Sequence, residues 1–562
     1  MALAYGNFHE LSHQLRFLLF EIGIGLPQNS IDYFITLAHK NTLNRMQQAV
    51  MAEKLCDSTI TSHHIHDFVD LLQFKLKSTI PESQFYQWNN LSEQLTESIA
   101  NEALGLAYLH NWNTKLVKEL QGYDSLWQWL YQGITASEAL LFLEQWSSYN
   151  EAYMPTSFAK KGYTRREILQ TSPGFQAKIR VHWCALHKSV TEAQPNVREY
   201  DQFIKQAFAK EHLIWREKIM HQRLSPDEYY PIPVHPLQWR KELQITLAPL
   251  IDAKLVLLHP NHQSLLALSQ EYLLPPNESR YLLKLASQRL NPEERNIDDQ
   301  FSTYQSLNCI LKDMDNYQNS LYLNDPFTEL KLRDTNKQTN MSASLHKNPV
   351  YTISTEQRVL PFSSLLMRSP ISGKPLLAEL IESSQMTPID YLALYTNTLL
   401  FGQLHLMVKH GVTFNPSTTQ PLIIVEKDRP QGIMIRTLDG LQLNSNPELK
   451  GQVPSAAFVS QAIKNDCLRF VESNVLNNLD AWVRCINEYF QIPQKQLWTV
   501  IKDRLTALFE QLSKDIDPKL LSQYKHSILT GDWQQECLLQ RSLSPIKNRS
   551  MTLKIPNYFD QF

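Results

Sequence analysis

The sequence predicts an α+β protein in which helical and strand-rich segments follow one another along the chain. Helix-period apolar patterns fill the first quarter, short apolar runs separated by prolines come next, and a helical pattern returns near residue 386. A chain of 562 residues is also longer than one hydrophobic core usually serves. We therefore expect a helical N-terminal part (1–140), a mixed, strand-rich middle (141–380) and a mixed α/β C-terminal part (381–562).

Composition narrows the class of function. Hydrophobic residues make up 43% and charged residues 20%, as in ordinary globular proteins, and the formal net charge of -2 gives no reason to expect nucleic acid or an acidic membrane as a partner. No apolar run approaches the roughly 20 residues needed to span a bilayer, and the N-terminus lacks the pattern of a secretory signal. Six cysteines without a CxxC pair suit buried thiols in a reducing compartment. We expect a cytoplasmic protein without a membrane segment.

The N-terminal part shows the 3.6-residue period. In "ELSHQLRFLLFEIGIGL" the apolar positions Leu11, Leu15, Leu18, Leu19 and Ile22 share one helical face. Similar patterns predict helices over 31–56, 84–121 and 124–146.

The histidines of "TSHHIHDF" raise the question of a metal site. His63 and His64 are adjacent, so on a helix they point about 100° apart, and no carboxylate–histidine motif follows. A helix start is the better interpretation of this segment.

The middle part contains "YYPIPVHPLQW" (229–239), which places His235 between two prolines. Each proline removes a backbone donor, so the segment suits an extended edge strand better than a helix. We expect His235 to anchor a loop by hydrogen bonds rather than to act in catalysis. Further strands are expected at "LVLLH" and "YLLKLA", and long loops over the polar stretch 313–346.

The C-terminal part opens with a helix signature. Thr387 is a good cap, Pro388 suits the first turn, and the helix should end at Gly411. "PLIIVE" and "GIMIRT" then predict a hairpin. Finally, "QKQLWTVIKDRLTALFEQL" places one set of apolar side chains on a single helical face: Leu497, Ile501, Leu505, Leu508 and Leu512.

Two segments carry candidate chemistry. Neither GxxxxGK[ST] nor GxGxxG is present, so any phosphate must be bound by side chains. If 281–286 is a strand, Arg280, Leu282 and Lys284 share a face, which fits either an anion clamp or a solvated basic edge. In segment 411–440, Arg436 and Asp439 lie together at the turn that follows a predicted hairpin. Taken without other evidence, this segment is interpreted as a surface hairpin.

Taken in order, these segments resemble the NRPS-independent siderophore synthetase family (aerobactin synthetase, IucA/IucC type). "PIPVHPLQW" is similar to the family's PxHPWQ segment and "NESRYLLKL" to its SxRT loop and following lysine. "GVTFNPSTTQ" falls on GIALEAHxQN and "RTLDG" on RDxxG, and the likeness runs from about residue 135 to the C-terminus.

The resemblance implies a three-lobed, hand-like architecture (thumb, fingers, palm) around a central cleft, and a role in siderophore biosynthesis and iron acquisition. Such enzymes use ATP and Mg²⁺ to adenylate a carboxylate, typically of citrate, and then join it to an amine or a hydroxyl. Homodimers are common among them. The resemblance implies that Arg280, Lys284 and Arg295 bind the ATP phosphates and that Asp439 binds Mg²⁺. It also implies that Arg436, Lys547 and Thr164 bind the substrate, and that Arg280 and Arg436 act in catalysis.

Several polar motif positions depart from the family. Two motif histidines are replaced by Glu151 and Met154, and a motif lysine by Phe158. The further replacements are Glu278, Tyr281, Asn415, Ser417, Thr419, Gln420 and Thr437.

Three hypotheses follow from these departures. The first is an active ATP-dependent carboxylate–amine ligase. The second is a non-catalytic member that keeps the fold as a binding or regulatory protein. The third is an enzyme of the same fold acting on another acid, with Glu151 favouring an amine.

Overall fold

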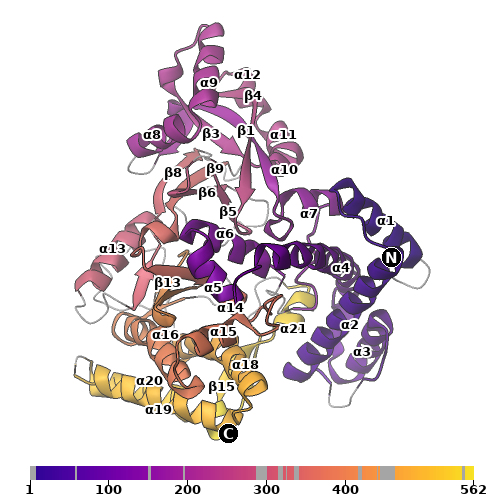
Figure 1. The fold of residues 1–562 in the computed structure, drawn as a ribbon, viewed down its shortest axis with the longest axis vertical. Helices are drawn as coiled ribbons and strands as arrows, with labels where there is room; N and C mark the ends of the chain where they lie inside the picture. Colours follow the sequence, from indigo (N-terminus) through magenta and orange to yellow (C-terminus); the bar gives the residue numbers. More distant parts are fainter. Residues whose placement is uncertain are drawn as a thin grey trace.

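The predicted α+β class is confirmed by the structure, a computed structural model, which mixes helices with mainly antiparallel sheets (Figure 1). In that view the N-terminal helices lie to one side, a large sheet lies above, and the C-terminal helices lie below. No helix in the described part of the chain is long and apolar enough to cross a membrane. The structure describes residues 8–56, 60–149, 154–193, 197–276, 278–285, 300–313, 320–324, 326–333, 341–414, 421–438, 441–443, 463–514, 516–546 and 551–561.

The N-terminal helices pack around one core, as the 3.6-residue spacing of their apolar residues predicts. Leu11, Leu15 and Leu19 are buried, whereas Ile22 is 45% exposed because the first helix ends at Glu21. His64 caps the third helix by accepting the backbone N–H of His66, so the histidine segment is confirmed as a helix start. The four long helices are α1 (Phe8–Glu21), α2 (Gln28–Ala52), α3 (Ile65–Thr79) and α4 (Trp88–Glu119).

The middle part forms an eight-stranded antiparallel sheet with the strand order β2-β8-β9-β6-β5-β4-β1-β3. One face packs on α8 (Val197–Ala207), where Phe203 and Ile204 share a core with Leu283 and Leu345. The strands are β1 (Lys178–His187), β2 (Thr191–Ala193), β3 (Tyr229–Val234), β4 (Val256–Ala267), β5 (Tyr272–Leu274), β6 (Tyr281–Leu285), β8 (Pro326–Leu332) and β9 (Ser342–Lys347).

The prediction of long loops over 313–346 is wrong for the strands that lie within it. β8 and most of β9 fall in this stretch, together with the short strand β7 (Leu321–Leu323). In β9 a polar face carrying Ser344 alternates with a buried face carrying Ala343 and Leu345. Because the polar face lowers the mean hydropathy of 313–346, the alternation of polar and apolar side chains that marks a strand is hard to recognise in the sequence.

The proline-rich segment forms β3, at the edge of the sheet, as its missing donors require. His235 follows it and caps α10 (Pro236–Gln238) by accepting the backbone N–H of Leu237. Burial, with smaller contributions from His182 and Lys241, lowers the pKa of His235 to about 4. The predicted anchoring role of this histidine is confirmed.

A second, four-stranded sheet has the order β10-β12-β13-β7, from β10 (Gln357–Pro361), β12 (Leu422–Glu426) and β13 (Arg429–Ile435). The predicted hairpin is β12 and β13, and it turns at Lys427 and Asp428, whose φ values are +48° and +65°. A two-residue turn of this hand matches the twist of the flanking strands. β7 closes the sheet in parallel with β13.

The two predicted C-terminal helices are confirmed. Helix α16 (Pro388–His410) is capped by Thr387, which accepts the N–H of Asp390 at 3.1 Å, and ends at Gly411 with φ +65°. In α19 (Gln494–Leu512) all five predicted apolar positions are buried.

Helix α6 (Ala136–Ser147) lies between the two sheets (Figure 1). Leu140 packs into the four-stranded sheet beside Met434, and the neighbouring Leu141 packs on the eight-stranded sheet beside Leu282. The Gln145 amide also donates to the Ala267 carbonyl at 2.7 Å. One helix therefore fixes the spacing of both sheets.

The end of the chain returns to the N-terminal helices. Leu539 and Leu543 of α21 (Leu538–Leu543) belong to the core of those helices. The Glu53 carboxylate, just after α2, accepts the backbone N–H groups of Leu539 and Gln540 at 2.6 and 2.9 Å. Residues almost 500 positions apart thus complete one core.

Glu472, buried in the π-helical segment η11 (Val471–Leu479) next to this junction, predicts a pH effect. Burial, and then the like charge of Glu536, raise its pKa from 4.5 to about 7, against the opposing pull of Arg541 and Arg469. Its contribution to stability is therefore full below pH 4.5 and is lost as the pH rises through 7.

Glu472→Gln removes this titration, while its amide oxygen still accepts the N–H of Glu536. Relative to wild type, the variant should gain on the order of 1–3 kcal/mol of unfolding free energy between pH 4.5 and 8. Urea titrations at several pH values measure this gain. A difference between variant and wild type that does not change with pH contradicts the prediction.

Candidate functional site

A polar cluster surrounds the buried Tyr272 at the seam between the two sheets. The Lys284 ammonium lies 5.9 Å from the centroid of the Tyr272 ring, and the Arg436 guanidinium carbon lies 5.8 Å from it. Both distances are within the range of cation–π attraction. Two of the predicted cations therefore meet at one ring, although 152 positions separate them in the sequence.

Strand register explains how Lys284 reaches this place. Tyr272 is opposite Lys284 in the β5–β6 pairing, and Lys284 is opposite Ser344 in the β6–β9 pairing. Directly opposite residues share a face, so these side chains and Leu282 lie on the side of the sheet that faces α6. The predicted common face of Leu282 and Lys284 is confirmed.

Each of these cations has a carboxylate partner. Arg436, which follows β13 and is 4% exposed, forms a buried ion pair with Glu144 of α6, which is 6% exposed. Lys284 lies 3.0 Å from a Glu271 carboxylate oxygen. A buried pair of this kind offsets the desolvation of both charges.

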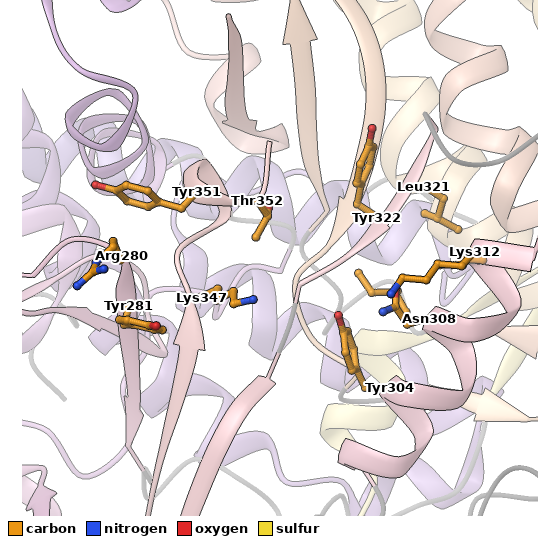
Figure 2. Close-up of a pocket in the computed structure, with 12 residues that line it drawn as sticks. Arg280, Tyr281, Tyr304, Asn308, Lys312, Leu321, Tyr322, Lys347, Tyr351 and Thr352 are labelled. Carbon is orange, nitrogen blue, oxygen red and sulfur yellow. The ribbon is translucent and has the colours of Figure 1, made fainter. Parts of the chain in front are cut away.

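An open pocket of about 530 Å³ lies beside this cluster (Figure 2). Its walls come from the ends of β6 and β9, the 3₁₀ turn η9 (Pro349–Tyr351), β7 and helix α13 (Gln300–Asp313). Lys347 on one side and Lys312 on the other extend toward the space between them in Figure 2. The described lining residues are Arg280, Tyr281, Tyr304, Asn308, Leu311, Lys312, Leu321, Tyr322, Leu323, Lys347, Tyr351 and Thr352.

The lining has a distinct chemistry. It holds three cations and four tyrosines, and none of its described residues is acidic. Cations bind phosphate oxygens, and aromatic rings stack on planar heterocycles. The volume falls in the range of small-molecule sites, roughly 300–1,000 Å³. The pocket therefore suits an anionic ligand with an aromatic part.

Arg280 lies in this pocket rather than at Tyr272. Its guanidinium donates to the Glu278 carboxylate at 2.6 Å, which raises the pKa of Arg280 and lowers that of Glu278. It also contacts Gln206 and Tyr281. The predicted cations that the structure describes thus occupy two neighbouring places, one for Lys284 and Arg436 and one for Arg280.

The remaining predicted residues divide into two groups. Thr164 caps α7 (Arg165–Thr171), with a reciprocal hydrogen bond to Glu167, so the structure gives it a helix-capping role. Arg295, Asp439 and Lys547 lie outside the described residues, as do Glu151, Asn415, Ser417, Thr419 and Gln420.

Sequence reasoning missed several residues of these two places. Nothing in the sequence links Glu144 to Arg436, which lies 292 positions away. Lys347 is brought opposite Tyr281 only by the pairing of β6 with β9, which the sequence does not predict. The alternation of polar and apolar residues in 342–347 was the signal for that strand.

Two family models match separate parts of the chain. Residues 139–270, which include most of α6 and all of β1 to β4, match the IucA / IucC family. Residues 390–551 match a model described as "Ferric iron reductase FhuF-like transporter".

Two relatives are similar to this chain over much of its length. The "Uncharacterized protein y4xN" of Sinorhizobium fredii is 22% identical over 570 aligned residues, covering 93% of this chain and 88% of that protein. A "Citryl-spermidine/3,4-dihydroxybenzoyl-citryl-spermidine:spermidine ligase" of Bacillus anthracis is 23% identical, covering 49% of this chain and 47% of that protein.

Solved structures share the fold. The petrobactin biosynthesis protein AsbB of Bacillus anthracis superposes with a TM-score of 0.75 at 14% identity, covering 99% of this chain and 98% of that one. ATP-bound aerobactin synthetase IucA of Klebsiella pneumoniae superposes with a TM-score of 0.67 at 15% identity, covering 89% and 88%. With the sequence matches, these likenesses lead to one conclusion: residues 139–270 match the IucA / IucC family, and most of the chain has the fold of aerobactin synthetase IucA and of AsbB.

Proposed function

We propose that this protein is an ATP-dependent ligase that activates a carboxylate and joins it to an amine or a hydroxyl. The observation that carries the proposal is the pocket beside α13, where Arg280, Lys312 and Lys347 meet four tyrosines without an acidic neighbour among the described lining. That combination suits a nucleoside triphosphate. Aerobactin synthetase IucA gives further support, because its solved structure is ATP-bound and it shares this fold.

The cations of the pocket have a defined role in this proposal. Lys347 and Lys312 reach in from opposite walls, so both ammonium groups approach one polyanion (Figure 2). When bound, ATP supplies the phosphoanhydride whose cleavage activates the carboxylate. Positive side chains fixed before the reaction stabilise the charge that develops on the phosphate.

Magnesium and the remaining contacts are also part of the proposal. Asp439 is the proposed Mg²⁺ ligand, and within the described residues no group of His, Cys, Asp or Glu is arranged to hold a metal ion. Arg295 would add to the phosphate contacts. Arg436 and Lys547, with Thr164, would hold the polycarboxylate substrate.

We further propose that the protein acts in siderophore biosynthesis for iron acquisition, in the cytoplasm. A homodimer and a three-lobed, hand-like arrangement of the parts 1–140, 141–380 and 381–562 belong to the same proposal. The amine substrates of the ligase from Bacillus anthracis suggest an amine as the nucleophile.

Calorimetry with ATP and Mg²⁺ tests the nucleotide site. Lys347→Ala should weaken binding about 10- to 100-fold, because one charge-assisted hydrogen bond is worth about 1.5–3 kcal/mol. Lys519→Ala is the matched control, since Lys519 is exposed on α20 (Pro518–Leu529) and does not line the pocket. Equal affinities of the two variants would contradict the proposed site.

A non-catalytic binding or regulatory protein is the second candidate. The observation that favours it is that Arg280, Lys284 and Arg436 each have a carboxylate partner, which lowers the positive charge offered to a ligand. Pyrophosphate release and hydroxylamine trapping with citrate and ATP separate the two candidates. Nucleotide binding without either product would favour the second.

The third hypothesis, a ligase for another acid, has its own test. A thermal-shift panel of acids and polyamines reports which charge class the protein binds. Stabilisation by cationic ligands alone would exclude citrate as the substrate.

A further inference from the structure

Glu278 and Arg280 form an ion pair at the open pocket beside α13. The Glu278 carboxylate accepts the Nε–H of Arg280 at 2.9 Å and an Nη2–H at 2.6 Å. It also accepts the backbone N–H of Arg280 at 2.9 Å. Two parallel donors on one edge of the guanidinium are what arginine presents to a phosphate or a carboxylate. Glu278 therefore occupies an edge of Arg280 that suits bidentate binding of a phosphate.

The backbone of this pair is anchored to the 3₁₀ turn η9. The Asn348 N–H donates to the Arg280 carbonyl at 2.8 Å, and the Asn348 side-chain amide donates to the Ser279 carbonyl at 2.8 Å. Asn348 is 1% exposed, and the Ser279 hydroxyl is hydrogen-bonded to that of Tyr351 at 2.5 Å. Because the main chain is held at Ser279 and Arg280, a change of partner for Arg280 requires only side-chain rotation.

The two side chains of the pair differ in their access to the pocket. The Arg280 side chain is 55% exposed and lines the pocket, whereas the Glu278 side chain is 12% exposed and is not among the described lining residues. In Figure 2 the Arg280 guanidinium does not extend into the space between Lys347 and Lys312. Exposed side chains change rotamer within nanoseconds. Arg280 thus lies at the pocket wall while its charge is directed to Glu278.

An entering polyanion has the charge to displace Glu278. An ion pair with one half-exposed partner is screened by solvent and contributes little to stability. Lys347 and Lys312 line the same pocket as Arg280, so three cations attract one ligand together. A triphosphate also carries more negative charge than the single carboxylate with which it competes for the guanidinium.

We propose that Glu278 is an internal competitor that sets the affinity of the pocket for phosphates. Its carboxylate holds Arg280 until a polyanion in the pocket takes over the guanidinium. The inference rests on the proposed binding of nucleotide at this pocket, and it assigns to Glu278 the control of that binding.

Calorimetry on the full-length protein with ATP and Mg²⁺ tests this role through a double-mutant cycle. Glu278→Gln keeps an oxygen for the backbone N–H of Arg280 but removes the competing charge, so it should bind ATP roughly fivefold more tightly than wild type. Arg280→Met alone should weaken binding only about twofold, because Glu278 already occupies the guanidinium. In the Glu278→Gln background the same substitution should weaken binding about tenfold.

The dependence on Arg280 separates competition from a general effect of charge. If Glu278→Gln does not tighten binding, or tightens it equally with Arg280 present and absent, the inference is overturned. Glu192→Gln is the matched control, since Glu192 lies at the edge of the same sheet, pairs with Arg333 at 3.7 Å and does not line the pocket. An equal gain in this control also overturns the inference.

The nucleotide site is judged separately by Lys347→Ala. If Lys347→Ala weakens ATP binding but the cycle shows no coupling between Glu278 and Arg280, this inference alone is refuted. If neither wild type nor Glu278→Gln binds ATP, both proposals are refuted. Thermal unfolding without ligand checks that each variant is folded, and Glu278→Ser, with the same expected results, replaces Glu278→Gln if the glutamine variant does not fold.

Discussion

Arg436→Met should lower the free energy of unfolding by about 3–5 kcal/mol, because it leaves the Glu144 carboxylate buried without a cation. Glu144 is 6% exposed, and Arg436 is the cation that pairs with it and donates a hydrogen bond to it. Urea titration at neutral pH measures the loss.

A double-mutant cycle controls this result. Glu144→Leu with Arg436→Met removes both charges and should recover most of the lost stability, because well-packed apolar side chains replace buried ion pairs at little cost. Additive losses in the double variant would mean that the two side chains do not stabilise each other.

Trp146→Ala should cost a similar amount, about 3–5 kcal/mol, because it removes a fully buried ring from the core. Trp146 lies on α6, stacks on Phe142 with centroids 5.5 Å apart, and donates its indole N–H to Asn113 at 3.0 Å. Trp146→Phe keeps an aromatic ring and should lose less. Urea titration measures both losses.

Phe20→Ala is the control for this substitution. Phe20 is 71% exposed, so its removal should change stability by no more than about 0.5 kcal/mol. A Trp146→Ala variant as stable as Phe20→Ala would show that the position of α6 does not depend on this ring.

The sequence predicts the elements whose signals are local. The cap at Thr387, the terminal glycine at 411 and the apolar face of α19 each depend on residues a few positions apart. The hairpin of β12 and β13 is predictable because its strands are apolar and joined by a short turn. The prolines of β3 likewise indicate an edge strand.

The site depends on distant pairings, which one sequence does not reveal. Lys284 is predictable as a cation on a strand face, but its neighbour Tyr272 follows from the register of β5 and β6. The pair of Arg436 with Glu144 follows from the position of α6 between the sheets.

The contact between α21 and the N-terminal helices has a consequence for the order in which the chain acquires its structure during synthesis. Leu539 and Leu543 complete a core that begins with α1. At about 5–20 residues per second, a ribosome needs roughly half a minute to two minutes to make the intervening chain. The first helices to emerge must therefore wait, with part of their apolar surface uncovered, until translation is nearly finished.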